Sequence, residues 1–257
     1  MKKVLVTGAN GQLGQCLQKI APLYKDLDFL FQSSKDLDIT NDVAVELLFE
    51  KEQFNYCINC AAYTNVEQAE KTPEIAFKVN AEGVRTLALF SKKYNVSLIH
   101  ISTDYVFDGE KKEPYTIDDI PNPINEYGKS KLLGEKYIQE IMENYAIIRT
   151  SWLYSEIGKN FYTTILKKAK AGENLAVTSN QTGCPTNANN LARYILELIV
   201  QNKKIVGIFH FTDGKSMTWY DFASKILLEN NLQKQVKLVD RSNYLNFAQR
   251  PTCSILK

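Results

Sequence analysis

The chain has 257 residues, enough for one large α/β domain, or for a main domain with a smaller lobe, around a substantial core. Its 31 basic and 29 acidic residues nearly balance, so the formal net charge is only +2. This small charge gives no general reason to expect binding to nucleic acid or to an anionic membrane, and anionic ligands must be held by local sites. The five cysteines are odd in number and lack paired zinc spacing, so we expect reduced thiols and no metal site.

No segment of the sequence is typical of a membrane or secreted protein. A glycine-rich loop begins within the first ten residues, which leaves no room for a signal peptide before it, and no later stretch is long and apolar enough to span a bilayer. The aromatic residues are scattered rather than interleaved with basic ones, which argues against a nucleic-acid surface. We therefore expect a cytoplasmic protein with a small-molecule substrate.

Strands and helices alternate through the first part of the chain. The expected strands are residues 4–6, 29–31, 56–59 and 98–101. The expected helices are residues 13–20, 43–49, 73–90 and a later one that carries Tyr127 and Lys131, after a proline-rich loop at 109–123. This alternation predicts an α/β fold of the Rossmann type, a doubly wound parallel sheet with helices on both faces.

The pattern becomes less regular after residue 150. Longer irregular stretches separate helices expected near residues 161–170, 191–200 and 219–228. We therefore expect a dinucleotide-binding Rossmann domain over residues 1–150. Residues 151–257 are expected to form mainly a smaller substrate-binding lobe, which could also return elements to the Rossmann sheet.

The sequence TGANGQLG at residues 7–14 follows the first expected strand and opens the first expected helix. In this context the first glycine allows a tight turn, the second lets backbone N–H groups approach a pyrophosphate, and the third lets helix and strand pack closely. The anion would rest at the N-terminus of the helix. The loop therefore predicts a dinucleotide site formed by Gly8, Asn10, Gly11, Gln12, Leu13 and Gly14.

The end of the second strand bears on which nicotinamide cofactor binds, because an acidic side chain there selects the 2′-hydroxyl of NAD. Gln32 has no charge, and Ser33 or its neighbours could bind a 2′-phosphate, so NADPH is the expected cofactor and NADH the alternative. Asp38 and Ile39 lie just beyond, where a short loop could meet the adenine. Asp38 could equally be an ordinary turn carboxylate before a helix cap.

Tyr127 and Lys131 are four residues apart in a segment expected to be helical. At this spacing they share one helix face, so the ammonium can lie near the phenol and favour its ionised form. The spacing is common on solvated helices, but here a cofactor loop accompanies it. Together they predict a hydride-transfer enzyme in which Tyr127 is the proton donor.

Further motifs lie along the chain: ISTDYVFDG at 101–109, YGKSKLLGE at 127–135, RTSW at 149–152, QTGCPT at 181–186 and RP at 250–251. With the glycine loop and the Tyr-x-x-x-Lys spacing they resemble the extended short-chain dehydrogenases that act on nucleotide sugars, and among these the dTDP-4-dehydrorhamnose reductase family. The resemblance covers nearly the whole chain. It implies reduction of the C4 ketone of dTDP-6-deoxy-L-lyxo-4-hexulose to dTDP-L-rhamnose, a sugar donor for bacterial surface polysaccharide.

The resemblance also implies roles for individual residues. Tyr127 would give its proton to the C4 oxygen, Lys131 would hold the nicotinamide ribose, and Thr103 would hydrogen-bond the reacting oxygen. Further cofactor contacts would be Ala62, Tyr63, Thr64, Asn80 and Ile101. Substrate contacts would be Thr103, Asp104, Val106, Trp152 and Arg250, the arginine pairing with the diphosphate. By placement alone, Thr103 could instead satisfy its adjacent loop and Trp152 could pack the lobe.

Two other kinds of function remain open. A related nucleotide-sugar reductase or epimerase would use the same Thr103, Tyr127 and Lys131. A non-catalytic member, like the regulatory subunit of methionine adenosyltransferase, would use the fold for assembly, although a scaffold has no need for a proton donor beside a ribose-binding lysine.

The sequence departs from the family pattern in two places. It ends at Lys257, soon after the Arg-Pro motif, where members of the family usually continue into a terminal helix. Some members dimerise through a metal held by acidic residues, but the matching positions here are Cys16 and the pair Asn189 and Asn190. We therefore expect no metal bridge, and a monomer or weak homodimer.

Overall fold

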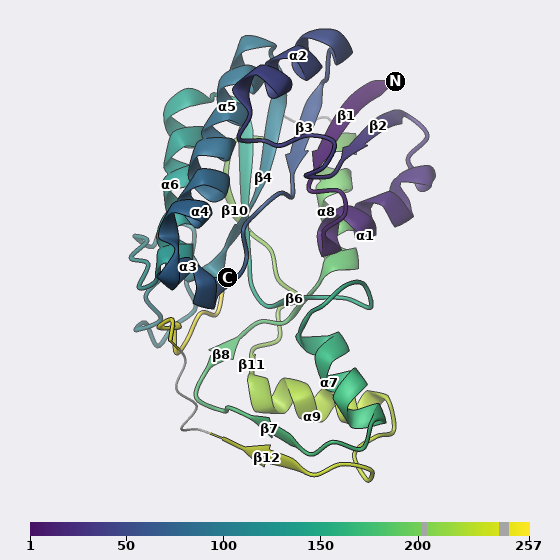
Figure 1. Ribbon diagram of the computed structural model, residues 1–257, viewed down its shortest axis with the longest axis vertical. Coiled ribbons are helices and arrows are strands. Elements are labelled where there is room, and N and C mark those ends of the chain that lie inside the picture. The colour runs from purple at the N-terminus through teal and green to yellow at the C-terminus, as the bar shows by residue number, and fades with distance from the viewer. Residues whose placement is uncertain (202–204, 242–246) are drawn as a thin grey trace.

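The computed structural model describes residues 1–201, 205–241 and 247–257. Within these residues a six-stranded parallel sheet, in the order β10-β5-β4-β3-β1-β2, lies between two layers of helices (Figure 1). Its strands are β1 (Lys2–Thr7), β2 (Leu27–Gln32), β3 (Tyr56–Asn59), β4 (Ser97–Thr103), β5 (Tyr145–Thr150) and β10 (Gly207–His210). The predicted α/β fold with a doubly wound parallel sheet is confirmed.

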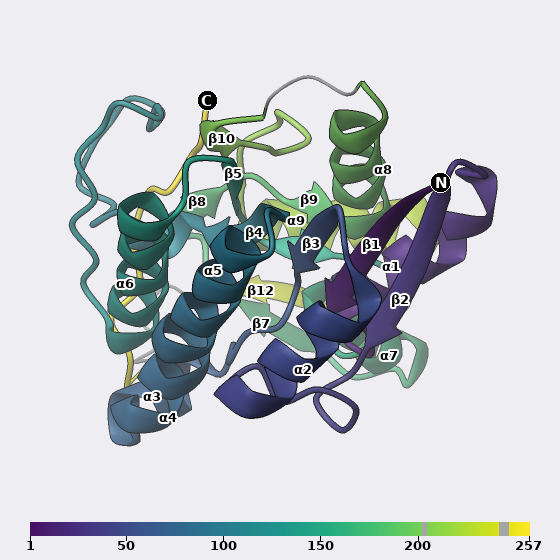
Figure 2. The ribbon, with the colours of Figure 1, turned by 90° about the horizontal axis from the view of Figure 1, so that it is seen from above.

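Helices cover both faces of this sheet (Figure 2). On one face, α1 (Gln12–Ile20) packs against α8 (Ala188–Val200). On the other face lie α2 (Asp42–Glu52), α5 (Gly83–Lys93) and α6 (Glu126–Ile141). The strand order reverses between β1 and β3, and ligands of such sheets bind where this reversal occurs, at the carboxyl ends of the strands.

The alternation of strand side chains divides the core between the two faces. Val4 and Val6 pack toward α1 and α8, whereas Leu5 packs toward α2 and α5, and all three are fully buried. The same alternation places Cys57 and Cys60 in opposite layers. These two thiols therefore do not face one another, and the five cysteines are free.

The helix predicted from Pro73 is present but not uniform. It runs as α4 (Pro73–Phe77), a π-helical turn (Lys78–Glu82) and then α5. Such π-helical turns occur often at functional sites. A short helix that we did not predict, α3 (Val66–Lys71), precedes it; its sequence VEQAEK has no apolar periodicity, and its start is fixed instead by the Asn65 side chain, which accepts from the Gln68 N–H.

The chain beyond β5 divides between the sheet and a smaller lobe. The helix α8 and strand β10 return to the sheet, where β10 pairs in parallel with β5. The lobe, below the sheet in Figure 1, contains α7 (Phe161–Lys170) and α9 (Trp219–Glu229), packed around buried Phe222. Its short strands pair as β6 (Leu153–Tyr154) with β9 (Thr186–Asn187), β7 (Leu175–Val177) with β12 (Leu238–Asp240), and β8 (Thr182–Gly183) with β11 (Met217–Thr218).

The C-terminal segment lies along the long loop that precedes α6. Tyr115 donates its N–H to the Ile255 carbonyl at 2.7 Å, and Lys257 donates to the Tyr115 carbonyl at 2.8 Å. Single 3-10 turns lie at Ala21–Leu23 and Asp104–Val106. Among the described helices, none has the length and apolar character needed to cross a membrane.

Candidate active site

A cavity of about 610 Å³ lies at the carboxyl ends of the strands and is lined by residues of both the sheet and the lobe. It collects side chains and backbone from the start of α1, the ends of β3, β4 and β5, and the starts of α6, α7 and α9. The predicted site residues that line it are Asn10, Gly11, Gln12, Leu13, Ala62, Thr64, Ile101, Thr103, Asp104, Tyr127, Lys131 and Trp152.

The loop between β1 and α1 leaves the first backbone N–H groups of the helix uncapped. The helix starts after Gly11, which provides no side-chain cap. Gly8 has φ +66°, and a Cβ there would lie 2.6 Å from the Ala61 nitrogen, so the turn requires glycine. A Cβ on Gly14 would lie 2.5 Å from the Gly8 carbonyl oxygen. Helix and loop are therefore as close as a pyrophosphate site needs.

The turn that follows β2 contains a carboxylate that was not predicted as part of the site, Asp36. Asp36 accepts from the Ser33 hydroxyl at 2.5 Å and from the Ser33 N–H at 3.0 Å. These hydrogen bonds lower the pKa of Asp36, so it is charged at neutral pH. The backbone of Gln32 is tied to the glycine loop, because its carbonyl accepts from the Ala9 N–H. The Ser33 hydroxyl is thus already occupied in this structure.

Asp38 and Ile39 serve the local turn and the core. The Asp38 carboxylate accepts from the Thr40 N–H at 2.9 Å and from the Thr40 hydroxyl at 2.8 Å. Ile39 is buried and packs against Gly83 of α5. Neither residue lines the cavity. Asp38 is therefore the ordinary turn carboxylate that the sequence left open as the alternative to an adenine contact.

Asn80, in the π-helical turn, fixes the segment that follows β3. Its Oδ1 accepts from the Tyr63 N–H at 2.8 Å, and its Nδ2 donates to the Tyr63 carbonyl at 2.9 Å and to Ser130 Oγ at 3.0 Å. This fully buried amide ties the loop that carries Ala62 and Thr64 to α6. Tyr63 and Asn80 themselves stay outside the cavity lining and support it from behind.

Tyr127 lies in the first turn of α6, which begins after Asn125; the Asn125 side chain accepts from the Gly128 N–H at 2.7 Å. Thr103 ends β4, and its side chain hydrogen-bonds that of Tyr127. Burial raises the pKa of the Tyr127 phenol well above its ordinary value, and the bond with Thr103 only partly opposes this. The phenol therefore keeps its proton at neutral pH, as a proton donor must.

Lys131 lies one helical turn after Tyr127 and is 2% exposed. Its Nζ donates to the Ile101 carbonyl at 2.6 Å and lies 3.2 Å from His100 Nε2. Burial lowers the pKa of Lys131 to about 8. Thr103, Tyr127 and Lys131 thus line the same cavity.

Asp104 follows Thr103 at the edge of the cavity and is buried. Its carboxylate accepts from Ser254 Oγ at 2.5 Å and from Thr103 Oγ1 at 3.1 Å. Burial raises the pKa of Asp104 to about 7 despite these hydrogen bonds. The carboxyl group therefore links the sheet to the C-terminal segment and changes charge near neutral pH.

The aromatic wall of the cavity is a stacked pair of tryptophans. The rings of Trp152 and Trp219 are 3.5 Å apart between centroids, with an interplanar angle of 5°. Trp152 has a φ of +47°, an uncommon backbone conformation for a residue other than glycine. Sequence reasoning placed Trp219 only at the start of a helix, because no local pattern indicates that it meets Trp152.

Asn160 is a second cavity residue that we did not predict. It caps α7, and its Nδ2 also donates to Gln12 Oε1 at 2.6 Å. This bond joins the lobe to the cofactor loop across 148 residues of sequence. Only the cap itself has a local signal in the sequence.

Two predicted substrate residues lie outside the cavity. Val106 is fully buried and packs with Phe107 and Leu256. Arg250 donates from Nη2 to Glu67 Oε1 at 2.9 Å, and so is paired within the protein. Among the described side chains, no group of three or more His, Cys, Asp or Glu could hold a metal ion.

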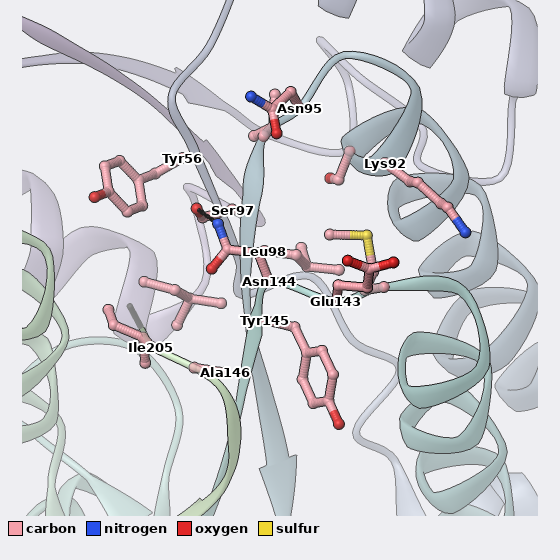
Figure 3. Close-up of a pocket in the computed structure, with 14 residues that line it drawn as sticks. Tyr56, Lys92, Asn95, Ser97, Leu98, Glu143, Asn144, Tyr145, Ala146 and Ile205 are labelled. Carbon is pink, nitrogen blue, oxygen red and sulfur yellow. Dashed lines mark hydrogen bonds between the residues drawn. The ribbon is translucent and has the colours of Figure 1, made fainter. Parts of the chain in front are cut away.

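A second cavity, of about 490 Å³, lies at the opposite end of the sheet (Figure 3). It is lined by Tyr56, Ser97 and Tyr145, the first residues of β3, β4 and β5. No predicted site residue borders it. Because open α/β sheets bind ligands at the carboxyl ends of their strands, we place the candidate active site at the cavity that contains Tyr127.

Residues 1–257 match a family model described as the RmlD substrate binding domain. The dTDP-4-dehydrorhamnose reductase of Aggregatibacter actinomycetemcomitans is 39% identical over 256 residues, which is 98% of this chain and 87% of that protein. The spore coat polysaccharide biosynthesis protein SpsK of Bacillus subtilis is 38% identical over 258 residues, covering 100% of this chain and 89% of that protein.

Solved structures agree with the sequence comparison. The dTDP-4-dehydrorhamnose reductase of Bacillus anthracis, crystallised in complex with NADP, is similar with a TM-score of 0.94 and 39% identity. The match covers 100% of this chain and 91% of that one. The family resemblance inferred from the motifs is therefore confirmed, and the chain belongs to the RmlD family of dTDP-4-dehydrorhamnose reductases.

Proposed function

We propose that this protein uses NADPH to reduce the C4 ketone of dTDP-6-deoxy-L-lyxo-4-hexulose to dTDP-L-rhamnose, with NADH as the alternative cofactor. One observation carries the proposal: Thr103, Tyr127 and Lys131 line a cavity that also reaches the uncapped start of α1. The NADP bound to the similar Bacillus anthracis enzyme supports the choice of cofactor. The proposal includes a monomer or weak homodimer as the active form.

The residues at the cofactor end fit a dinucleotide. The uncapped N-terminus of α1 presents backbone N–H groups to an anion, so Gly11, Gln12 and Leu13 would hold the pyrophosphate. Lys131 would hold the nicotinamide ribose. When bound, the dihydronicotinamide supplies the hydride for C4.

The chain itself provides the proton and stabilises the developing charge. Tyr127 donates its phenol proton to the C4 oxygen as that oxygen becomes negative. Thr103 hydrogen-bonds the same oxygen and keeps the phenol in place. A charged Lys131 then stabilises the phenolate left on Tyr127 until solvent returns a proton.

The remaining predicted residues would recognise the sugar nucleotide. Asp104 and Trp152 border the cavity and would contact the substrate. Arg250 would contact the diphosphate; its Nη2 is paired with Glu67 in this structure.

The direct test is to mix the purified protein with enzymatically prepared dTDP-6-deoxy-L-lyxo-4-hexulose and follow NADPH absorbance, with NADH in a parallel cuvette. Sugar-dependent oxidation with dTDP-L-rhamnose as product establishes the reductase and ranks the cofactors. Turnover without added cofactor, from protein purified with oxidised nucleotide, would instead indicate an epimerase. Cofactor binding without any sugar-dependent oxidation would point to the regulatory role.

A further inference from the structure

A chain of buried polar side chains runs from β1 to the active-site lysine. The Thr7 hydroxyl donates to Asn59 Oδ1 at 2.7 Å, Asn59 Nδ2 lies 3.0 Å from His100 Nδ1, and His100 Nε2 lies 3.2 Å from Lys131 Nζ. None of these four residues is more than 2% exposed. Thr7, Asn59 and His100 do not border the active-site cavity, so their polar atoms must be matched by their neighbours.

The direction of these hydrogen bonds is fixed at Asn59. The backbone N–H of Ala61 lies 3.1 Å from Asn59 Oδ1, and a backbone N–H can only donate. The atom facing Ala61 must therefore be the amide oxygen. The amide nitrogen of Asn59 then faces His100, and it too can only donate.

The orientation of Asn59 determines which nitrogen of His100 carries the proton. Because Nδ1 accepts from Asn59, a neutral imidazole must have its proton on Nε2. The Nε2–H points at Lys131 Nζ, which can accept it only as a neutral amine with a free lone pair. An ammonium at Lys131 would find no hydrogen-bond acceptor at His100, because Nε2 carries the proton.

We propose that His100 is a positioning residue for Lys131: held by Asn59 with its proton on Nε2, the imidazole donates to the lysine nitrogen and favours the neutral amine in the cofactor-free site. The amine keeps one N–H for the Ile101 carbonyl and another for a ligand hydroxyl. His100 thus aims the nitrogen at the cavity and limits how strongly it holds a proton. The catalytic consequence rests on the proposed reductase function, but the hydrogen-bond direction does not.

The other ionisable groups around Lys131 come from three elements. They are Cys60 after β3, Glu135 and Tyr127 on α6, and His100 on β4. Burial raises the pKa of Cys60 to about 12, so this thiol stays neutral below that pH. Burial opposes the ammonium and Glu135 favours it, and an Nε2–H on His100 would act in the same direction as burial. Burial by itself already lowers the pKa of Lys131, so the contribution of His100 must be measured separately.

The tautomer can be measured without any activity. The chain has only two histidines, so protein labelled with ¹⁵N-histidine gives two imidazole spin systems, and His210→Asn assigns them. We expect the imidazole of His100 to show a protonated Nε2 and a bare Nδ1 above about pH 8, where Lys131 is a neutral amine. A protonated Nδ1 would overturn the proposal. In Asn59→Asp the carboxylate accepts from Nδ1, so the proton should move to that nitrogen.

The effect on the pKa of Lys131 is measured from the pH dependence of kcat/KM. The alkaline limb of this profile is the pH range in which kcat/KM falls as Lys131 loses its proton. His100→Asn keeps an acceptor for Asn59 but has no group that reaches Lys131, so the limb should move up by about one pH unit, the order expected for one buried hydrogen bond. His100→Gln places an amide N–H near the position of Nε2 and should restore the wild-type limb.

Two controls accompany this measurement. His210→Asn removes the other histidine of the sheet, which contacts the Tyr115 and Lys257 carbonyls, and should leave the profile unchanged. Thermal melts show whether each variant is folded. If the alkaline limb of the kcat/KM profile lies at the same pH in His100→Asn and in the wild type, the proposal is contradicted. If wild type reduces no sugar, the proposed function fails, and the imidazole spectra still decide the hydrogen-bond direction.

Discussion

The two sides of the active site differ in what their functional groups contact. On the sheet side, Thr103 and Lys131 are buried and held by hydrogen bonds within the cavity wall. On the lobe side, Trp152 is stacked on Trp219, and Arg250 is paired with Glu67. Under the proposed function, the sheet side is arranged for chemistry before any ligand binds, whereas Trp152 and Arg250 already have partners within the protein.

The largest expected effect comes from removing the proton donor on the sheet side. Tyr127→Phe should lower kcat by roughly 10²- to 10⁴-fold, the usual contribution of a positioned acid, and leave the fold intact. Steady-state reduction with a thermal melt measures both. Tyr137→Phe is the matched control on the same helix, since its hydroxyl faces Glu82. If Tyr127→Phe kept wild-type turnover, Tyr127 would not be the proton donor.

Most elements on the sheet side of the active site could be predicted from the sequence, because each is indicated by a local sequence pattern. Glycine spacing locates the cofactor loop, alternation locates the strands, and the i, i+4 spacing places Tyr127 and Lys131 on one helix face. The proposed role of His100 was not predicted, because its partners come from another strand, β3, and from the helix α6.

The lobe side was much less predictable, because its contacts join segments that are distant in sequence. The Ser254 hydroxyl reaches Asp104 across 150 residues, and Asn160 reaches Gln12 across 148. Trp219 has no local feature that points to Trp152. Two features on the sheet side were also missed: the short helix α3 lacks a hydrophobic period, and the carboxylate of Asp36 lies beyond the position at which cofactor choice is usually read.

The second largest effect concerns Asp104, which joins the two sides. Its pKa is about 7 in the folded protein against an ordinary 3.8, so the folded state keeps a proton that the unfolded chain releases between about pH 4 and 7. Stability should therefore fall as pH rises through this window. Asp104→Asn cannot ionise, so by pH 8 it should gain a few kcal/mol relative to wild type. Urea unfolding at pH 5 and pH 8 tests this, and parallel pH dependences would contradict it.

A smaller effect is expected on the aromatic wall. Trp219→Leu removes the ring stacked on Trp152, so the KM for the nucleotide sugar should rise by up to about tenfold, while kcat changes little. Trp219→Phe keeps an aromatic face and should show a smaller rise. An equal loss of kcat in both variants would place Trp219 in the chemical step and weaken the contrast between the two sides.

The smallest effect should appear at the adenosine end of the sheet side, where Asp36 already occupies the hydroxyl of Ser33. Its charge would lie near a 2′-phosphate bound there, so Asp36→Asn should improve kcat/KM for NADPH relative to NADH by about threefold. Because Asp36 is exposed, the gain should shrink as salt is raised. Asp28→Asn, on β2, is the control for loss of one negative charge. If both variants change the ratio equally, or if the gain is independent of salt, then Asp36 acts on protein structure and not on the cofactor's charge. Ser33 would in that case be fixed in place by Asp36, and the 2′-phosphate would have to be held elsewhere.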